Sequence, residues 1–425
     1  FMLLAKHPKW QDQIKYCQFE NTIHVRGQSI QPESILDVII WIAGTYRVNF
    51  EKSVIGDILL KIAKENQYHS LLEKLQNGFY GPKNAKWDQT KRIDEFLYKY
   101  LGVKITNYDA DDFEGKTPEQ QKEMDLANSQ RKELVFAYSR KMFLSLMARL
   151  LWARTGTDID VHSILCIYGT QGLGKGFCLK ALCLEDRYFS NTSLDMRSKD
   201  APLKLRAKMI YELAELAKRS KDIEIEKAFI TDAKDTAVLK YEKYSSELPR
   251  QCIFVATTNK LNILRDATGS RRWWPIIAGE TFAEGETIDI DVIKKIAPQL
   301  WHEALHILTK QKIEHNAKIY TAQEAITPSQ EKERVKDRKV FISVHPWRRI
   351  IENWITLNLE IPDINNDYVF YKNSKKEKVK YFVILDYTPI YEELDIAPNK
   401  RRHTDREQID MVLTGLGFFK KRWRF

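Results

Sequence analysis

One short segment constrains the fold of this 425-residue chain more than any other: a glycine-rich stretch that follows an apolar run. Residues 162–168 read HSILCIY, which predicts a buried strand, and residues 169–176 read GTQGLGKG before a new helical pattern. Glycines let backbone N–H groups turn inward around an anion, and the following helix adds the positive end of its dipole. The strand–loop–helix order therefore favours a phosphate-binding loop over a glycine turn without a ligand.

The stretch also matches the pattern GxxxxGK of nucleotide-binding loops, in which the lysine reaches the β- and γ-phosphates. Lys175 is that lysine, so ATP and Mg²⁺ are the expected cofactors. Gly176 stands where the pattern has serine or threonine, whose hydroxyl normally binds Mg²⁺, and we expect a water or another side chain in that role. The residues predicted to surround the phosphates are Gly169, Thr170, Gln171, Gly172, Leu173, Gly174, Lys175 and Gly176.

Two further apolar runs, KMIYEL at 208–213 and QCIFVATTN at 251–259, predict central strands. Apolar strands separated by helical patterns indicate a parallel α/β sheet. We therefore predict an α/β fold with a P-loop NTPase core at residues 131–330.

The core is predicted to have a domain on either side. Residues 1–130 mix helical patterns with short strand-like pieces and predict a mostly helical N-terminal domain. An acidic stretch within it, at 107–125, is expected to be a solvated linker, and a long amphipathic helix is expected at 132–153. Residues 331–425 predict a C-terminal domain.

Polar side chains at the ends of the predicted strands supply the groups that ATP hydrolysis needs. Glu212 ends the second strand and Glu215 follows three residues later, so these carboxylates are predicted to bind Mg²⁺, through Glu212, and to polarise the attacking water. Asn259 ends the third strand and is the candidate sensor of the γ-phosphate. The alternatives are two solvated glutamates at a helix start and a capping asparagine.

Paired arginines follow the third strand, in the segment LRDATGSRRWWP at 264–275. Arg271 or Arg272, with Arg265 nearby, is predicted to enter the site of a neighbouring subunit and neutralise charge in the transition state. The alternatives are a basic surface patch and an arginine–aromatic stack on nucleic acid.

The order of these motifs resembles the virulence-associated E family, ATPases similar to superfamily 3 helicases that occur in phages and pathogenicity islands. The segment LRDATGSRRWWP is its most specific element, and WDQTKRIDEFLYKYLG at 87–102 extends the likeness upstream. The resemblance implies a core of AAA+/superfamily 3 type with ATP phosphates at Gly172, Gly174 and Lys175, an acidic pair Glu212 and Glu215, the sensor Asn259 and the finger Arg271 or Arg272. Two positions depart from the family pattern: Gly176, and Val238, where arginine is common.

In superfamily 3 helicases the segment between the acidic strand and the sensor strand forms a hairpin that grips single-stranded DNA in the pore of a ring. Here that segment contains Lys240, Tyr241 and Lys243. Lysines neutralise phosphates and tyrosines stack on bases, which suits a flexible strand. The alternative is a solvated hairpin tip of mixed charge.

Residues 388–425 predict two helices and then a basic, aromatic strand, which is the outline of a winged helix. Thr388 is expected to cap the first helix. The residues expected to contact DNA phosphates are Arg401, Arg402, Arg406, Lys421 and Arg422. The alternative is a small capping domain whose charges only solvate it.

Composition indicates the compartment and the class of partner. The formal net charge of +10 indicates a polyanionic partner. Five scattered cysteines without a C-x-x-C pair argue against a disulfide framework or a zinc site and fit a reducing cytoplasm. The family resemblance implies that this is the cytoplasm of a bacterial host cell. No apolar run approaches the ~20 residues of a membrane span, and the start FMLLAKHPKW predicts a fragment of a longer protein.

Together with the family resemblance, these patterns predict an ATP-dependent DNA helicase for the replication of a phage or mobile genetic element. We expect a homo-oligomeric ring, a hexamer, that binds single- and double-stranded DNA and hydrolyses ATP between subunits. Two alternatives stay open: an ATPase or small-molecule kinase that needs no nucleic acid, and a degenerate loop in a module that binds DNA or a partner. Gly176 keeps the last alternative open.

Overall fold

The computed structural model describes residues 1–78, 86–153, 159, 161–214, 228–238, 245–259, 272–314, 351, 371–372, 378–379, 388–394, 396–398, 401, 406, 409 and 413. The chain divides into two compact units, Phe1–Phe341 and Ile342–Phe425. No helix in the described ranges is long and apolar enough to cross a membrane.

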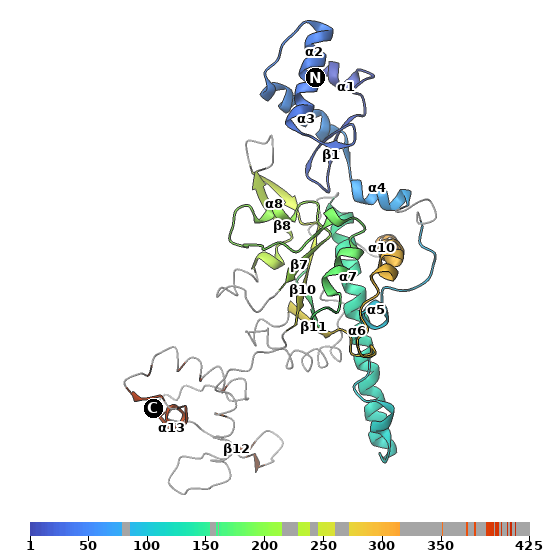
Figure 1. Cartoon of the computed structure of the whole chain (residues 1–425), viewed down its shortest axis with the longest axis vertical. Coiled ribbons are helices and arrows are strands. Elements are labelled where there is room, and N and C mark those ends of the chain that lie inside the picture. Colours follow the sequence, from blue (N-terminus) through green and yellow to red (C-terminus); the bar gives the residue numbers. More distant parts are fainter. Residues whose placement is uncertain are drawn as a thin grey trace. The chain divides into compact units, whose positions relative to one another are not determined.

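Five parallel strands form the central sheet of the first unit (Figure 1). They are β5 (Ile164–Tyr168), β6 (Phe189–Ser190), β7 (Ile210–Ala214), β10 (Ile253–Thr258) and β11 (Trp273–Ile277), in the order β11-β5-β10-β7-β6. Every residue of β10 is buried, as expected for a central strand of a parallel sheet. The three strands predicted from apolar runs, β5, β7 and β10, therefore lie side by side, and the prediction of a parallel α/β sheet is confirmed.

The edge strand β11 was not predicted from the sequence. It contains Pro275, which has no N–H to donate and is tolerated because an edge strand has a neighbour on one side only. Trp274 of the same strand is 4% exposed, and its ring stacks on that of Tyr138 with 4.8 Å between centroids. The Lys141 ammonium lies 4.7 Å from the Trp274 centroid. Trp274 is therefore a core residue and does not offer a surface for stacking on nucleic acid.

Three helices pack together beside this sheet: α6 (Pro118–Ala153), α7 (Lys175–Leu182) and α10 (Ile290–Glu314) (Figure 1). Trp301 of α10 is fully buried and donates from Nε1 to the carbonyl oxygen of Leu182 at 2.7 Å. Its ring also packs edge-on against Phe143 of α6. This one side chain thus joins the helix that follows the glycine-rich stretch to the two longer helices.

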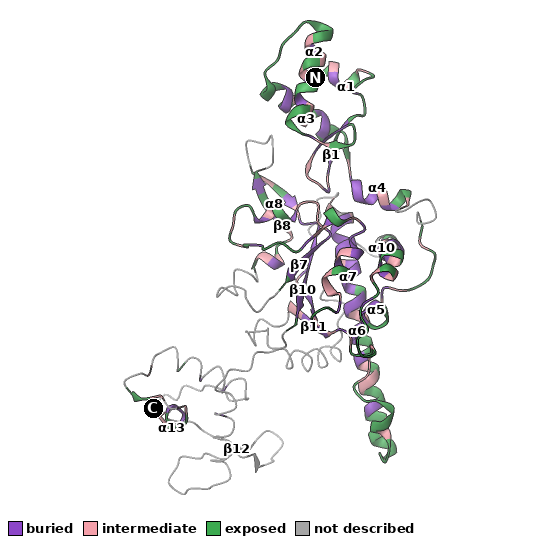
Figure 2. Cartoon of the chain, in the orientation of Figure 1, coloured by how far each residue is buried: buried purple, intermediate pink, exposed green. Residues whose placement is uncertain are grey.

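Residues 107–125, predicted to be a solvated linker, are partly helical, because α6 begins at Pro118. Thr117 and Gln120 form a capping box at this start. The Gln120 amide donates to Thr117 Oγ1 at 3.3 Å, and the Thr117 amide donates to Gln120 Oε1 at 3.0 Å. The first turns of α6 are largely exposed and its second half is buried (Figure 2). The cap satisfies the end of the helix despite the acidic composition, and the boundary predicted between residues 130 and 131 falls inside α6.

The N-terminal elements form a core of their own. A sheet in the order β3-β2-β1-β4 consists of β1 (Ile14–Cys17), β2 (Thr22–Val25), β3 (Gln28–Ser29) and β4 (Gln67–Tyr68). It shares an apolar core with α1 (Met2–Lys6), α2 (Pro32–Tyr46) and α3 (Lys52–Glu65). Helices α4 (Ser70–Asn77) and α5 (Phe96–Leu101) contribute instead to the core around the central sheet. The region predicted to be mostly helical therefore also contains a four-stranded sheet.

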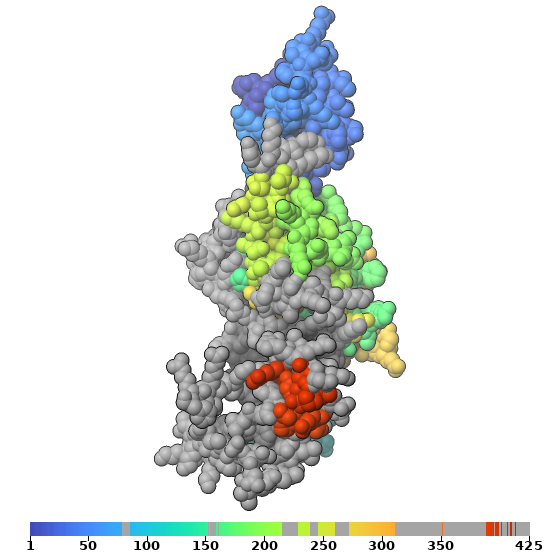
Figure 3. Space-filling model, turned by 90° about the vertical axis from the view of Figure 1, so that its left-hand side faces the viewer, coloured from blue at the N-terminus to red at the C-terminus, as the bar shows by residue number. Residues whose placement is uncertain are grey.

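An antiparallel hairpin of β8 (Lys234–Val238) and β9 (Ser245–Pro249) lies in the chain between β7 and β10. It packs on the short helix α8 (Ala201–Leu205), and Figure 3 shows both segments, in green and yellow-green, on one face of the molecule. A hairpin at this place agrees with the sequence-based expectation. Its predicted DNA-contacting residues, Lys240, Tyr241 and Lys243, lie outside the described residues.

The second unit is described only in short pieces. Strand β12 (Tyr371–Lys372) pairs with β13 (Lys378–Val379), and α13 (Thr388–Glu393) lies where a helix capped by Thr388 was expected. The guanidinium of Arg401 lies 4.8 Å from the ring centroid of Tyr391 on α13. Arg402, Lys421 and Arg422 lie outside the described residues, so the winged helix stays a prediction.

Replacing Trp274 with alanine should lower the free energy of unfolding by about 3–5 kcal/mol, the usual cost of emptying a buried aromatic site. The matched control is Phe177→Ala, because Phe177 is 70% exposed and its loss leaves no cavity. Chemical denaturation of both variants measures the difference. Equal destabilisation by the two substitutions would contradict the assignment of Trp274 to the core.

Candidate functional site

The carboxyl ends of β5, β7 and β10 meet at one edge of the central sheet, beside an open cavity of ≈ 840 Å³. In open parallel sheets this edge is where ligands bind. Its wall includes Gln171, Gly172, Gly174, Lys175, Gly176, Glu212 and Asn259, all predicted from the sequence as site residues, together with Thr257 and Thr258. The parallel register thus brings three separate sequence segments to one cavity.

The turn after β5, residues 169–174 (the glycine loop), has a defined backbone. Gly172 and Gly174 have φ of +87° and +94°, a region in which residues with a side chain are strained. Leu173 between them is buried, and its carbonyl oxygen accepts a hydrogen bond from the Ile288 amide at 3.1 Å. Helix α7 begins directly afterwards, at Lys175, so the amides of its first turn lack intrahelical partners. The loop and helix start therefore have the geometry of an anion-binding turn.

The Lys175 ammonium lies within this turn. Nζ donates to the carbonyl oxygens of Gly169 and Thr170, both at 2.8 Å. Burial lowers the pKa of Lys175, and the negative charge of Glu212 partly opposes that shift. The ammonium is thus held by two carbonyl oxygens, which an anionic ligand can replace.

Glu212 is the acidic group of the site. Its side chain is buried, the residue being 5% exposed, and Oε1 accepts a hydrogen bond of 2.6 Å from Thr257 Oγ1. Burial raises the pKa of Glu212, whereas Thr257 and the positive charge of Lys175 act in the opposite direction. The carboxylate therefore lies in a position where its charge is only partly balanced within the protein, which suits a group that binds a cation.

Thr257 is a site residue whose role sequence analysis missed. A threonine at the end of a buried strand is common, and its bond to Glu212 depends on the pairing of β10 with β7. Asn259, the predicted sensor, follows β10, is exposed and lines the cavity. Glu215 lies outside the described residues.

A further wall of the cavity had no signal in the sequence. It comes from α7, from residues 186–192 around β6 and from the two ends of β7, and Lys180 of α7 forms an ion pair with Asp186 at 2.7 Å. Lys208 adds an ammonium whose Nζ donates to the carbonyl oxygen of Phe189 at 3.2 Å. The other residues of this wall are Phe177, Ser190, Asn191, Thr192 and Ala214. They are scattered polar and apolar positions without a motif.

Arg272 directly precedes β11 and is far from the glycine loop of its own chain. The register pairs Trp273 with Ile164 and Ile277 with Tyr168, so Arg272 is at the amino end of the strands and the loop at the carboxyl end. A strand rises about 3.3 Å per residue, so β5 alone separates these ends by roughly 13 Å. That is longer than an extended arginine side chain. Arg271 lies outside the described residues.

The base of the β8–β9 hairpin is fixed by a buried ion pair. Arg250 donates from Nε to Asp235 Oδ2 at 3.0 Å and from Nη2 to the other carboxylate oxygen, and both side chains are nearly inaccessible. Val238, which departs from the family pattern, is exposed at the end of β8. The ion pair therefore joins β8 to the residue that directly follows β9.

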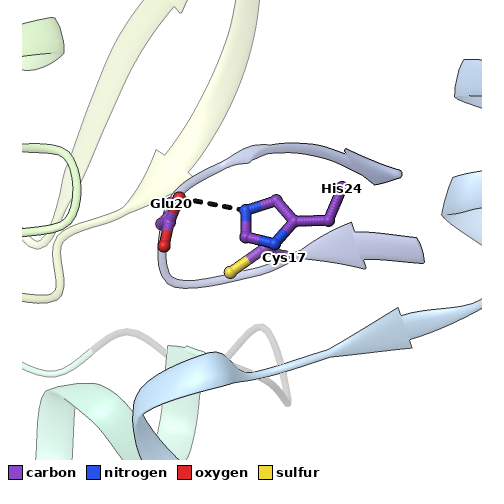
Figure 4. Close-up of side chains that lie close together, drawn as sticks. All are labelled: Cys17, Glu20 and His24. Atoms are coloured by element: carbon purple, nitrogen blue, oxygen red, sulfur yellow. Dashed lines mark hydrogen bonds and ion pairs between the residues drawn. The ribbon is translucent and has the colours of Figure 1, made fainter. Parts of the chain in front are cut away.

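Cys17, Glu20 and His24 form a second polar cluster at the β1–β2 hairpin (Figure 4), with one ligand atom of each within 4.8 Å of the others. His24 Nε2 is 2.9 Å from Glu20 Oε2, and the Tyr68 hydroxyl is 2.5 Å from His24 Nδ1. Cys17 Sγ donates to Ser70 Oγ at 3.2 Å. Sequence spacing did not reveal this group, because the two strands bring it together. Each side chain has a partner in the protein, so these hydrogen bonds account for the cluster.

A model of the virulence-associated protein E-like domain matches residues 113–337, more than half of the chain. The chain belongs to this family. The match to the virulence-associated protein E-like domain begins just before α6 and covers the whole central sheet, so it contains both the glycine loop and Glu212. The resemblance drawn from the sequence motifs is confirmed.

Solved structures similar to this family member are those of the C-terminal region of NrS-1. The apo structure of its residues 305–718 has 16% sequence identity and a TM-score of 0.44, covering 83% of this chain and 80% of that chain. An A-form apo structure of the same region has 17% identity and a TM-score of 0.41, with the same coverage. No curated protein matches the chain.

Glu212→Gln should make the protein more stable at neutral pH, because glutamine keeps an oxygen for Thr257 and removes a buried charge. A raised pKa means that the folded protein binds the proton more tightly than the unfolded chain, so wild-type stability falls as pH rises from the ordinary glutamate pKa to the folded one. The gain in melting temperature over wild type should be absent at pH 4 and present at pH 8. Glu284→Gln, on the surface, should show no such gain, and a pH-independent difference for Glu212→Gln would contradict this electrostatic origin.

Proposed function

We propose that this chain is an ATP-hydrolysing DNA motor that serves replication of a phage or mobile genetic element. The observation that carries the proposal is the convergence of the glycine loop, Lys175 and the buried Glu212 at the carboxyl edge of a parallel sheet. Membership of the virulence-associated protein E-like family supports it.

The residues present fit a nucleotide with a divalent cation. The Lys175 ammonium would exchange its two carbonyl partners for phosphate oxygens, and the first-turn amides of α7 would bind the same anion. Glu212 would hold Mg²⁺, which neutralises phosphate charge when bound. Asn259 stands at the cavity, where its amide can orient the attacking water, and Glu215 is proposed as the second acid.

The position of Arg272 supports catalysis between subunits. Arg272 lies at the amino ends of the strands, whereas the glycine loop lies at their carboxyl ends. Arg272 could therefore serve as an arginine finger only in the site of another copy. A ring of identical subunits, a hexamer in our proposal, would place the amino ends of the strands in one copy against the cavity of the next. The half-buried Arg272 has an Nε without a hydrogen-bond partner among the described residues.

DNA is the proposed partner. Lys240, Tyr241 and Lys243, which lie in the sequence between β8 and β9, would contact single-stranded DNA by phosphate neutralisation and base stacking. The basic C-terminal residues, among them Arg401 and Arg406, would contact duplex DNA as a winged helix does.

Lys175→Ala should abolish ATP hydrolysis and leave the fold intact, because the ammonium is the main protein charge available to the terminal phosphates. Phosphate release measured with and without single-stranded DNA tests this. Lys294→Ala is the matched control and should retain most activity, because Lys294 is an exposed lysine of α10 that does not line the cavity. Unchanged turnover in Lys175→Ala would refute the site, and hydrolysis that DNA does not stimulate would favour an ATPase or kinase independent of nucleic acid.

Two inactive variants, Lys175→Ala and Arg271→Ala/Arg272→Ala, should recover activity when mixed. Their mixed interface pairs an intact loop on one chain with intact arginines on the other, and an arginine finger contributes on the order of a thousandfold in rate. ATPase assays and analytical ultracentrifugation on the same mixtures report activity and co-assembly. Co-assembly without recovered activity would mean that these arginines do not act across the interface.

A further inference from the structure

Gly176, the first-turn residue of α7 that departs from the loop pattern, is packed against Glu212. A Cβ atom placed at position 176 would lie 3.1 Å from both Oε1 and Oε2 of Glu212 and 3.5 Å from its Cδ. Contacts at 3.1 Å are tighter than ordinary van der Waals packing, so a side chain here would require the carboxylate to move. The backbone of Gly176 is not in the left-handed region, so its conformation does not require a glycine. The nearby carboxylate of Glu212 is what leaves no room for a side chain at this position.

Glu212 has little freedom to retreat from such a side chain. It belongs to β7, which pairs with β10 on one side and β6 on the other, so its backbone is fixed by the sheet. Its side chain is buried, and the 2.6 Å bond from Thr257 holds Oε1. Moving the carboxylate by even a few tenths of an ångström would strain that bond or displace the start of α7.

We propose that Gly176 and Glu212 are a complementary pair, in which the glycine makes room for the carboxylate to stand where a serine or threonine side chain would otherwise be. The carboxylate then takes over the role of the missing hydroxyl as an oxygen ligand for the divalent cation that accompanies the nucleotide. This inference rests on the proposed nucleotide site and names how that site holds its cation. Carboxylate oxygens are preferred ligands of Mg²⁺, so the exchange is chemically favourable.

The pair makes a prediction opposite to that of a degenerate loop. In a degenerate loop, Gly176→Ser would restore a lost ligand and strengthen the dependence of nucleotide binding on Mg²⁺. In a complementary pair, the serine would displace Glu212 and weaken that dependence. Gly176→Ala adds a Cβ without a hydroxyl, so it tests the steric effect of a side chain separately from the gain of a metal ligand.

The experiment is isothermal titration calorimetry of ADP and of a non-hydrolysable ATP analogue, with Mg²⁺ and with EDTA. We expect Mg²⁺ to tighten binding to the wild type, and Gly176→Ala and Gly176→Ser to reduce that gain by about tenfold or more, the usual cost of disturbing a metal ligand. Affinity in EDTA should change little. Gly44→Ala is the matched control, since Gly44 is also in a helix and a Cβ there meets no atom within 4 Å.

A double variant tests the pair even if the single substitutions disturb folding. Glu212→Asp shortens the side chain by one methylene, so Gly176→Ser/Glu212→Asp should bind with a larger Mg²⁺ gain than either single variant, with circular dichroism confirming the fold. The pair would be overturned if Mg²⁺ tightened nucleotide binding to Gly176→Ala as much as to the wild type, or more to Gly176→Ser than to the wild type. It would also be overturned if the double variant showed no compensation. A wild type that binds neither nucleotide under either condition would overturn the proposed function itself, and the pair with it.

Discussion

The pairing of β10 with β5 on one side and β7 on the other is the constraint on which the site depends. It aligns Thr258 with Tyr168, the last residue before the glycine loop, and Val255 with Glu212. Side chains alternate between the faces of a sheet, so a slip of one residue would turn Glu212 to the other face. Thr257 could then no longer donate to it. The site is thus a product of strand register.

This arrangement costs stability. Glu212 is a carboxylate in a buried position, and its pKa is raised because one threonine hydroxyl and a nearby lysine offset only part of the lost hydration. A packed apolar side chain would be less costly at this point of β7. The rest of the core offsets the cost: Trp274 and Trp301, both buried, tie the sheet and helices together away from the cavity. Buried charge that structure alone does not need is typical of a functional site.

Much of this could be predicted from sequence where the signal is local. Buried strands read as short apolar runs, and the glycine loop reads as a pattern, so β5, β7, β10 and the cavity residues on their ends were found. The helix start at Pro118 was not predicted, although its Thr117–Gln120 capping box is also local, because it lies in a stretch whose acidic composition is typical of a linker. Groups formed across strands could not be found, since neither Thr257 with Glu212 nor Cys17 with His24 has a characteristic spacing.

The close approach of Gly176 to Glu212 shows why a departure from a motif is ambiguous until the opposing strand is known. Read along the chain, a glycine in place of a hydroxyl residue is a lost ligand. Across the sheet, the same glycine leaves the carboxylate undisturbed, because a Cβ at this position would stand 3.1 Å from both of its oxygens and push it aside. The loop and the acidic strand are therefore coupled: a serine at position 176 would require the carboxylate of Glu212 to shift. For this reason the effects of substitutions at positions 176 and 212 should not be independent, because the two side chains occupy the same space.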